Sequence, residues 1–366
     1  MRFSPADGRL VCDYCGHSEP LTGAPPERVR IEEIDFRDGA LASLPDTETI
    51  VSRYTKCPNC GAEFEFDPNI HAAVCPFCGT PVVADTGESR HIKPKAVAPF
   101  VLSERAARAA MTGWLGRLWF APSGLTDYAR KGRAMQGIYV PYWTFDADTR
   151  SAYSGRRGTV YYVTEHVTLR DAQGRSRTEA RQVPRIRWTP VSGRVARFFD
   201  DVLVLASRSL PKAHTEALTP WDLARLQPYS PEFLAGFRAE GYTVSIEEGM
   251  ATARAHMDQM IERDVRFDIG GDRQEIDRIE TRLSDVTFKH VLLPVWLAAY
   301  RFRGRSYRFV VNGQTGKVSG ERPYSPVKIA AAAILALILA GGAIYVAERN
   351  GWLNDAASGW SVQFGN

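Results

Sequence analysis

Two pairs of cysteines constrain the fold of this chain more than any other feature of its sequence. Cys57, Cys60, Cys75 and Cys78 follow the spacing C-x2-C-x14-C-x2-C, and each pair belongs to a C-P-x-C-G unit. Four thiolates at this spacing form the closed tetrahedral shell of a structural Zn²⁺ site, with Zn–S bonds of roughly 2.3 Å. The pattern predicts a zinc ribbon over residues 55–83. A redox dithiol pair is the competing interpretation, although that motif typically occurs once beside a βαβ unit.

The N-terminus repeats the second half of this ribbon. Residues 3–16 align without a gap on residues 66–79, and a Phe, a Pro, a Val, both cysteines, an aromatic residue and a Gly coincide. Cys12 and Cys15 therefore predict half of a second zinc site, whose first knuckle is missing. We interpret Met1 as an internal methionine of a longer reading frame. The alternatives are a site completed by another chain or by His17, and an empty, decayed ribbon.

The use of cysteine also indicates the compartment. All 6 cysteines lie before residue 80 and occur in C-x-x-C pairs, unlike the scattered cysteines of a secreted disulfide framework. This arrangement favours metal binding in a reducing compartment. The residues after Met1 include no apolar run typical of a signal peptide, so we expect the N-terminal part in the cytoplasm.

A second constraint is an apolar segment near the C-terminus. Residues 329–347 are 19 consecutive residues without a charge, which at about 1.5 Å per residue nearly span the ~30 Å hydrocarbon core of a bilayer. Residues 327–347 are the predicted transmembrane helix, and a buried helix of a soluble protein is the alternative. The basic residues shortly before it are Arg308, Lys317, Arg322 and Lys328, whereas Arg349 alone follows.

This charge bias predicts an orientation. Basic residues stay on the cytoplasmic side of a membrane helix, so the N-terminal domains should be cytoplasmic. The short tail over residues 348–366 should then be extracytoplasmic. We expect a single-pass protein of the cell inner membrane.

The region between the two constraints predicts an α+β fold. Residues 1–19 form the half ribbon and 20–54 an acidic spacer that leads to the complete ribbon. Residues 95–322 form a β-rich middle domain with flanking helices. The expected architecture is therefore rubredoxin-like zinc-ribbon modules, then the β-rich domain, then one C-terminal transmembrane helix.

Hydrophobic periodicity and the positions of capping and turn residues predict helices and strands within the middle domain. Helices are expected over 104–119 with Ser103 as N-cap, from Ser230-Pro231 to Gly241, and over 246–261. Strands are expected over 160–169 and 177–188, joined by a turn at 171–174, and over 198–205. A further hairpin is expected from 297–302 and 307–311.

A weak internal repeat suggests that the middle domain is duplicated. Residues 139–145 resemble residues 292–298, and each segment contains a proline followed closely by a tryptophan. We expect each proline to stand at the start of a strand, where it costs no ladder hydrogen bond. Chance similarity over so few residues is the alternative.

Motifs for catalysis are absent from the sequence. It contains no G-x-x-x-x-G-K-[ST], G-x-G-x-x-G, H-E-x-x-H or G-x-S-x-G string, and its 7 histidines are dispersed. Asp200 and Asp201 are adjacent, and adjacent residues of a strand face opposite sides. The arginine-rich stretches 181–197 and 301–308 alternate with apolar residues, which favours a solvated sheet face. We expect no catalytic residues and structural Zn²⁺ as the cofactor.

Several of these motifs together resemble a known family. The C-P-x-C-G units, the Val-Pro-Tyr-Trp stretch at 140–143, the stretch 307–317 and the apolar segment are similar to those of bacterial zinc-ribbon, single-pass membrane proteins. Such proteins are often labelled primosomal protein N-prime (replication factor Y), superfamily II helicase-like or TFIIB-type zinc ribbon-containing protein. A helicase needs a phosphate loop, which this sequence lacks. The resemblance implies instead a context with SPFH/flotillin-type and phage-shock-protein-A-type membrane-stress factors. This chain departs from the family in lacking the first knuckle.

The sequence therefore favours a non-enzymatic, membrane-anchored adaptor that recruits cytoplasmic protein partners. The resemblance implies that it acts in an envelope-stress module. The alternative is nucleic-acid binding in a replication or helicase-associated role. Residues 57–78 contain no Lys or Arg and carry Glu63, Glu65 and Asp67, the opposite of what counterion release requires. The formal net charge of +4 is too small to favour nucleic acid by itself. An unrecognised enzyme in the middle domain is a third hypothesis.

Overall fold

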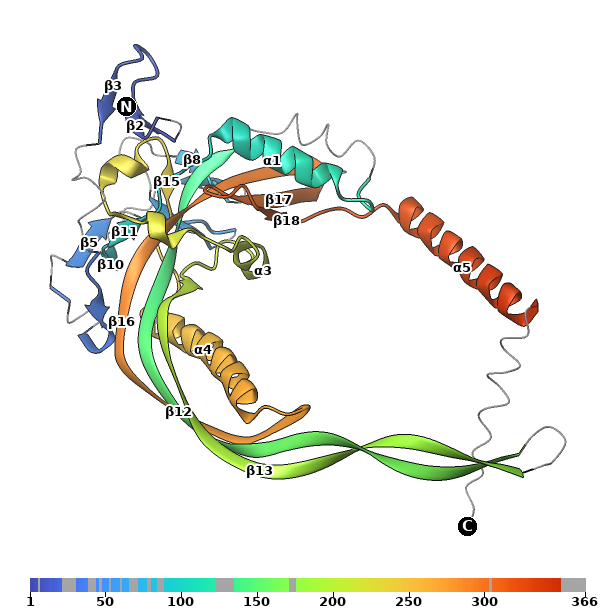
Figure 1. Cartoon of the computed structure of the whole chain (residues 1–366). Helices are drawn as coiled ribbons and strands as arrows, with labels where there is room; N and C mark the ends of the chain where they lie inside the picture. Colours follow the sequence, from blue (N-terminus) through green and yellow to red (C-terminus); the bar gives the residue numbers. More distant parts are fainter. Residues whose placement is uncertain are drawn as a thin grey trace.

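The chain has a mixed α+β fold that is rich in β-structure and is built around one large sheet (Figure 1). The computed structural model describes residues 1–5, 7–21, 31–38, 44–45, 48–52, 54–59, 61–65, 72–77, 80–83, 89–122, 135–170, 176–302 and 305–349. Its α-helices are α1 (Glu104–Gly116), α3 (Lys212–Glu216), α4 (Ile246–Ile269) and α5 (Pro326–Arg349). Short 3-10 helices cover Phe36–Asp38, Leu223–Arg225 and Pro231–Leu234.

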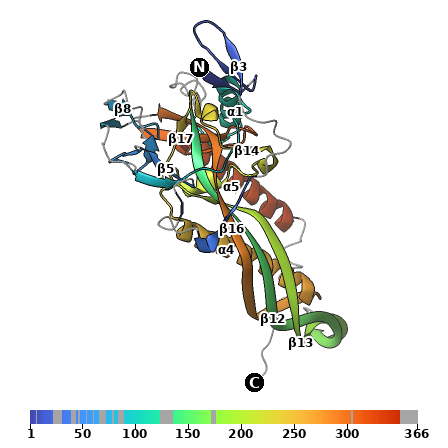
Figure 2. The same ribbon diagram turned by 90° about the vertical axis from the view of Figure 1, so that its left-hand side faces the viewer.

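Three long antiparallel strands form the body of the sheet. They are β12 (Gln136–Arg170), β13 (Ser176–Leu205) and β16 (Arg273–Phe302), with β12 in the middle. A hairpin joins β16 to β17 (Arg305–Asn312), which also pairs with β18 (Val318–Gly320). Short strands complete the sheet: β4 (Ile34–Asp35), β11 (Ala96–Val97), β14 (Gln227–Pro228) and β15 (Arg238–Ala239). Figure 2 shows the three long strands running together away from the N-terminal strands.

The long strands bend at one level of the sheet. Around Asp146 of β12 the pairing shifts by one residue toward both neighbours. Asp201 of β13 and Asp285 of β16 lie at these shifts with left-handed φ angles of 51° and 52°, a conformation that Asp adopts more readily than most residues. β-Bulges bend a strand and increase its twist. The two aligned bulges therefore curve the sheet.

α4 packs in the concave face of the curved sheet (Figure 1). Ser245 and Glu248 form a capping box at its start. Arg197 of β13 donates two hydrogen bonds of 2.6 and 2.7 Å to Asp264, which ties the helix to the sheet. The buried residues recur every three or four positions and form one face: Ile246, Gly249, Ala253, Met257, Ile261, Val265 and Ile269.

Pro141 and Pro294 occupy equivalent places in the two central strands. The Pro141 carbonyl accepts the N–H of Ala206, one residue beyond the end of β13. The Pro294 carbonyl accepts the N–H of Gly313, one residue beyond the end of β17. Each proline therefore lies where its outer neighbour stops, so its missing N–H breaks no ladder hydrogen bond. The expectation that each proline begins a strand is wrong, because β12 and β16 continue on both sides of them.

The same order of elements occurs around Pro141 and around Pro294. α1 precedes β12 and its hairpin partner β13, and α4 precedes β16 and its hairpin partner β17. This order agrees with a duplication of the middle domain, which stays a prediction.

Other predicted elements differ in extent from the observed ones. Ser103 caps α1 by accepting the N–H of Ala106, as predicted, but the helix ends at Gly116. The predicted strands over 160–169 and 177–188 pair with each other, as ends of far longer strands. Their turn at 171–174 lies outside the described residues. The hairpin predicted around 304 is present between β16 and β17.

The helix predicted from Ser230 to Gly241 is wrong. The structure has one 3-10 turn over Pro231–Leu234 and then β15. Gly236 takes a φ of 84°, and Phe237 stacks on Phe100 with ring centroids 4.2 Å apart. Packing of the aromatic side chain thus overrides a favourable helix start.

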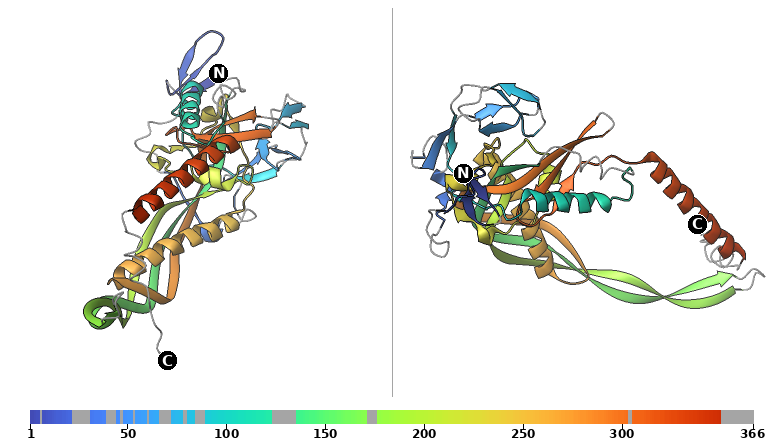
Figure 3. Two further views of the ribbon diagram at one scale, coloured as in Figure 1. Left: turned by 90° about the vertical axis from the view of Figure 1, so that its right-hand side faces the viewer. Right: turned by 90° about the horizontal axis from the view of Figure 1, so that it is seen from above.

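The N-terminal strands and α5 lie at opposite ends of the molecule (Figures 1 and 3). The N-terminal strands form small sheets: β1 (Arg2–Ser4), β2 (Arg9–Val11) and β3 (Ser18–Pro20); β5 (Thr49–Ser52) with β10 (Ser89–Ile92); β6 (Tyr54–Lys56) with β7 (Glu63–Glu65); and β8 (Ala72–Val74) with β9 (Pro81–Val83). The predicted spacer thus contributes β4 and β5 to the fold. α5 and the tip of the β12–β13 hairpin both project away from these strands.

Candidate metal centre

The first cysteine of each C-x-x-C unit directly follows the first strand of a short hairpin of the same length. The residue before the first cysteine pairs with the residue seven positions later: Val11 with Ser18, Lys56 with Glu63, and Val74 with Pro81. The three segments therefore share one local fold, as their sequence similarity predicts.

The hydrogen bonds inside these turns are also the same. The N–H of Cys12, Cys57 and Cys75 each donates to the carbonyl five residues on, at 2.8 Å. The N–H groups of Gly16 and Gly61 donate back to the cysteine carbonyl at 2.9 Å. These glycines have φ angles of 71° and 72°, where a Cβ would be strained. The glycine of each described C-P-x-C-G or C-x-x-C-G turn is thus needed to close the knuckle.

The first cysteines of the two knuckles in residues 55–83 are buried in a common cluster. Cys57 and Cys75 are each 1% exposed and belong to one hydrophobic cluster with Phe64 and Phe77. Asn59 Nδ2 donates to Thr80 Oγ1 at 3.0 Å and joins the two turns. Cys60 and Cys78 lie outside the described residues. Within the described residues no three His, Cys, Asp or Glu side chains are gathered as metal ligands.

The donor set and the turns fit a thiolate-bound metal. Soft thiolates are the ligands of structural Zn²⁺, and four of them leave no open position for water. In the N-terminal knuckle, the backbone N–H groups of Cys15 and Tyr14 lower the pKa of the Cys12 thiol, which favours the thiolate. His17, the candidate third ligand of this half site, has its Nε2 3.3 Å from Glu19.

The complete ribbon segment packs directly against the middle domain. The N–H of Gly241 donates to the Glu63 carbonyl at 3.1 Å, and Phe64 forms an isolated β-bridge with Glu240. Phe64 belongs to the same buried cluster as Tyr142 of β12. The described residues of the segment 55–83 are therefore held on the sheet by both backbone bonds and apolar contacts.

Glu240 is the charged residue at this junction. It is 1% exposed, and Ser207 Oγ donates to its Oε1 at 2.5 Å. Burial raises its pKa to about 8, with a further contribution from Glu63, while the Ser207 and Ser209 hydrogen bonds oppose the shift. The side chain is therefore largely a neutral acid near neutral pH.

The N-terminal half ribbon docks at a separate place. The N–H of Phe3 donates to the Ala235 carbonyl at 2.9 Å. The Phe3 ring is 2% exposed and packs edge-on against Phe233, with centroids 5.5 Å apart. Both cysteine-bearing segments are thus joined to the middle domain through buried aromatic residues.

A buried charge cluster at the bend of the sheet was missed by sequence reasoning. Lys289 Nζ lies 2.8 Å from Glu33, 2.7 Å from Asp201 and 3.8 Å from Asp146. Burial and the Glu33 hydrogen bond raise the pKa of Asp146 to about 7. Asp201 lies at a β-bulge, which turns its side chain toward Lys289. The rule that neighbouring residues of a strand face opposite sides therefore did not predict this cluster.

Aromatic rings pack around His290, which follows Lys289 in β16. The His290 ring lies 5.0 Å from Trp143 and 5.6 Å from Tyr242. Its Nδ1–H donates to the Ile92 carbonyl at 2.8 Å. Burial lowers the pKa of His290 to about 4, so the ring is neutral near pH 7. Its role is therefore packing and hydrogen bonding.

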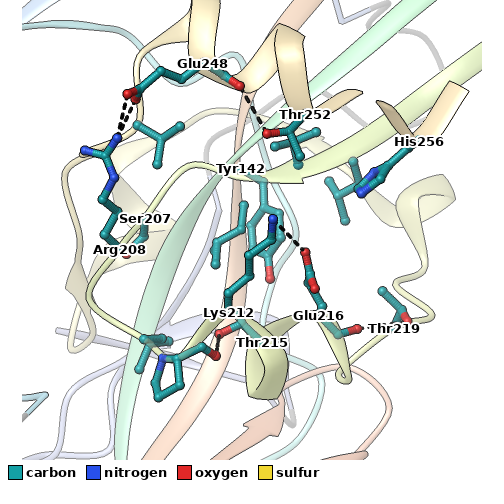
Figure 4. A pocket seen from close by; sticks show the side chains of 16 residues that line it. Tyr142, Ser207, Arg208, Lys212, Thr215, Glu216, Thr219, Glu248, Thr252 and His256 are labelled. Atoms are coloured by element: carbon teal, nitrogen blue, oxygen red, sulfur yellow. Dashed lines mark hydrogen bonds and ion pairs between the residues drawn. The ribbon is translucent and has the colours of Figure 1, made fainter. Parts of the chain in front are cut away.

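A cavity of about 780 Å³ lies between α3, α4 and β13 (Figure 4). Its charged side chains are paired with each other. Arg208 donates to both carboxylate oxygens of Glu248 at 2.7 Å, and Lys212 lies 3.6 Å from Glu216. The apolar part of the lining includes Leu203, Leu205, Leu210 and Val244.

α5 is long and apolar enough to span a membrane. It covers Pro326–Arg349, which includes the predicted segment 327–347, and none of its residues is buried. Lys328 at its start donates to the Ala121 carbonyl at 2.8 Å, which joins the first turn of the helix to the body. The tail beyond residue 349 lies outside the described residues.

The fold and these features define a β-rich α+β protein with cysteine knuckles at one end and an apolar helix at the other. No family model matches the chain, and no solved structure matches it. It is similar to YdjG of Bacillus subtilis (strain 168), named an uncharacterized protein, with 26% identity over 332 residues that cover 90% of this chain and 89% of YdjG. A stretch of 57 residues is 32% identical to Transcription factor S of Methanothermococcus thermolithotrophicus, covering 16% of this chain and 54% of that protein.

Proposed function

We propose that this chain is a non-enzymatic membrane adaptor: α5 anchors it, and its cysteine knuckles and β-rich body recruit cytoplasmic protein partners. The observation that carries the proposal is α5 itself, an apolar helix of 24 residues with none of them buried. A helix that is apolar all round is stable when it is covered on all sides. The body leaves α5 uncovered, and a bilayer supplies the missing cover.

Charge distribution supports an orientation with the body in the cytoplasm. Arg308, Lys317, Arg322 and Lys328 precede the apolar part of α5, and Arg349 follows it. Basic residues are retained on the cytoplasmic side. The knuckles, at the end of the molecule away from α5, would then face the cytosol (Figure 3).

The proposal includes one structural Zn²⁺ held by Cys57, Cys60, Cys75 and Cys78. Its supports are the ligand spacing, the matched turns and the burial of Cys57 and Cys75 in one cluster. A small ribbon has little core of its own, so a metal would stabilise its fold. Cys12 and Cys15 would supply half of a further site. Metal content per chain and its loss in Cys75→Ser test this part, with Cys12→Ser as the matched control that leaves the complete site intact.

Membrane insertion, orientation and partners are tested in cells of a bacterial host. We expect the full chain to resist alkaline extraction of membranes, and a tag before Met1 to resist protease added outside the inner membrane. Purification from membranes should then recover soluble partners, with SPFH/flotillin-type and phage-shock-protein-A-type proteins as the expected class. Recovery of the chain in the soluble fraction would contradict the anchor, whereas loss of partners alone would contradict the adaptor role.

Nucleic-acid binding is the second candidate, favoured by the partial similarity to a protein named as a transcription factor. Residues 57–78 lack Lys and Arg, which opposes it. Titration of the detergent-solubilised chain with labelled duplex and single-stranded DNA at low and high salt distinguishes nucleic-acid binding from the adaptor role. Salt-dependent binding that is lost with Cys75→Ser would favour this candidate.

A further inference from the structure

The distal part of the β12–β13 hairpin extends beyond the rest of the sheet. β16 begins at Arg273, opposite Gly158 of β12. From Thr159 onward β12 pairs with β13 alone, up to Arg170 opposite Ser176. We name residues 159–170 and 176–187 the arm; at about 3.3 Å per residue it is roughly 40 Å long. A two-stranded ribbon is at best marginally stable in water, so a surface that covers the arm would stabilise it.

The arm is basic on one face. Arg181, Arg185 and Arg187 stand at alternate positions of β13 and therefore share a side of the ribbon. Arg185 pairs with Glu165 across the strands at 2.6 Å, and Arg187 lies 5.1 Å from the ring of Tyr161. Over both strands of the arm five arginines stand against two glutamates. An anionic partner is the complement of this face.

The arm also exposes apolar side chains next to the arginines. Tyr161, Val163 and Val167 are exposed on the same face as the arginines, because they stand opposite Arg185, Val183 and Glu179 in the register. Tyr162 and Ile186 are exposed on the other face of the ribbon. Aromatic rings with a polar tip favour the level of lipid headgroups. Guanidinium groups bind phosphate oxygens in a bidentate way. This combination fits the interface of an anionic bilayer better than a purely polar polyanion.

We propose that the arm lies against anionic phospholipid headgroups of the bilayer that α5 crosses. The inference rests on the proposed membrane anchor. Figures 1 and 3 show that the arm and α5 project to the same side of the molecule, away from the N-terminal strands. Because α5 is joined to the body at its first turn and has no buried residue, the bilayer sets its tilt. The arm and the anchor would hold the body at two points.

The test places a fluorescent amino acid at Tyr162 of the full chain, on the face of the ribbon away from the arginines, so that the label leaves the contacting side chains in place. The protein is reconstituted in phosphatidylcholine vesicles with or without roughly 30% phosphatidylglycerol. Spin-labelled headgroup lipids act as the quencher. A second protein carries the fluorophore at Tyr14, which is fully exposed in the N-terminal knuckle. We expect quenching at 162 in anionic vesicles, much less in neutral vesicles, and none at 14 in either.

A triple variant defines the basis of the contact. Arg181→Gln, Arg185→Gln and Arg187→Gln together should reduce the equilibrium constant of the contact on the order of a hundredfold, which lowers the quenching at 162. The matched Arg→Lys triple variant keeps the charge and should retain quenching, and it also controls for folding of the arm.

Equal quenching at 162 in both kinds of vesicle, or none in either, would overturn the proposal. A change at 162 on adding short duplex DNA, without a change on adding anionic lipid, would assign the arm to nucleic acid instead. Alkaline extraction of the same vesicles reports on α5 separately. Release of a chain that still shows quenching at 162 would contradict the anchor and leave the arm contact in place.

Discussion

Lys289 balances three carboxylates that the bulges bring together at the bend of the sheet. Glu33, Asp146 and Asp201 come from three separate strands or their flanks, and Lys289 is 7% exposed. Hydrogen bonds to Asp201 and Glu33 outweigh burial and hold the pKa of Lys289 above its usual range. The lysine therefore stays charged and ties the predicted spacer to the sheet.

Removal of this lysine should destabilise the fold strongly. Lys289→Met leaves the buried Asp146 and the partly exposed Glu33 and Asp201 without their cation, which costs up to about 3–5 kcal/mol, the value for fully buried pairs. Because the pKa of Asp146 is about 7, this carboxyl group is ionised at about pH 8 and protonated at about pH 5, so we expect a larger loss of thermal stability at the higher pH. Tryptophan fluorescence of the detergent-solubilised chain measures both. Arg278→Met, at an exposed site of β16, is the control, and equal losses at the two pH values would contradict the charge argument.

Glu240 predicts a second pH dependence at the junction between ribbon and body. Its pKa is about 8 in the folded chain and 4.5 in the unfolded one, so the folded state binds the extra proton between these values. The contribution of Glu240 to the free energy of unfolding is therefore largest at the low-pH end of this interval. This contribution decreases by about 1.4 kcal/mol for each unit by which the pH rises.

Glu240→Gln should remove this dependence. The amide oxygen still accepts the Ser207 hydrogen bond and the side chain no longer ionises. We expect the variant to match the parent at about pH 5.5 and to be more stable at about pH 7.5. Thermal unfolding at the two pH values measures it. Glu240→Ala should lose stability at both, and a pH profile of Glu240→Gln that parallels the parent would refute the assignment.

At the scale of elements, α4 is fitted closely to the sheet at one glycine. A Cβ on Gly249 would lie 2.7 Å from Cδ1 of Trp143, whereas a Cβ on Gly113 of α1 meets nothing within 4 Å. The same substitution should therefore have opposite effects. Gly249→Ala should cost about 1–3 kcal/mol through overpacking, and Gly113→Ala should gain roughly 0.5–1 kcal/mol through helix propensity.

Thermal unfolding of the two alanine variants beside the parent measures this pair. A gain for both would mean that Trp143 moves aside without cost. A loss for both would show that α1 is also constrained at Gly113.

Local signals predicted where elements begin, and tertiary contacts set where they end. The helix predicted over 246–261 begins where α4 begins, but α4 continues to Ile269, and its last turns depend on the bond between Arg197 and Asp264, which no periodicity reveals. The length of β12 likewise depends on β16, which follows much later in the chain. The knuckle turns were predictable because Cys and Gly positions define them locally. Their docking through Phe64 and Glu240 was not, since it joins distant residues.

For the whole molecule, the proposed anchor would make membrane association sensitive to one charge. Leu337 lies in the middle of α5 and is 72% exposed. Leu337→Arg places a cation near the bilayer centre, which costs about 2.5–3.5 kcal/mol on insertion scales. We expect a larger fraction of the chain in the alkaline extract. Leu337→Phe should stay with the membrane, and unchanged extraction of Leu337→Arg would argue that α5 lies outside the bilayer.

The order of the strands along the chain has a kinetic consequence. β13 follows β12 closely, so their hairpin forms between near neighbours, but β16 begins after α4 at Arg273. During synthesis, the edge of β12 that will pair with β16, over residues 136–158, therefore stays unpaired until β16 has been made. Pairing of distant segments is slow, and an open strand edge is a template for aggregation. Newly made chains should depend on chaperones until β16 arrives, and yields on refolding should fall steeply as protein concentration rises.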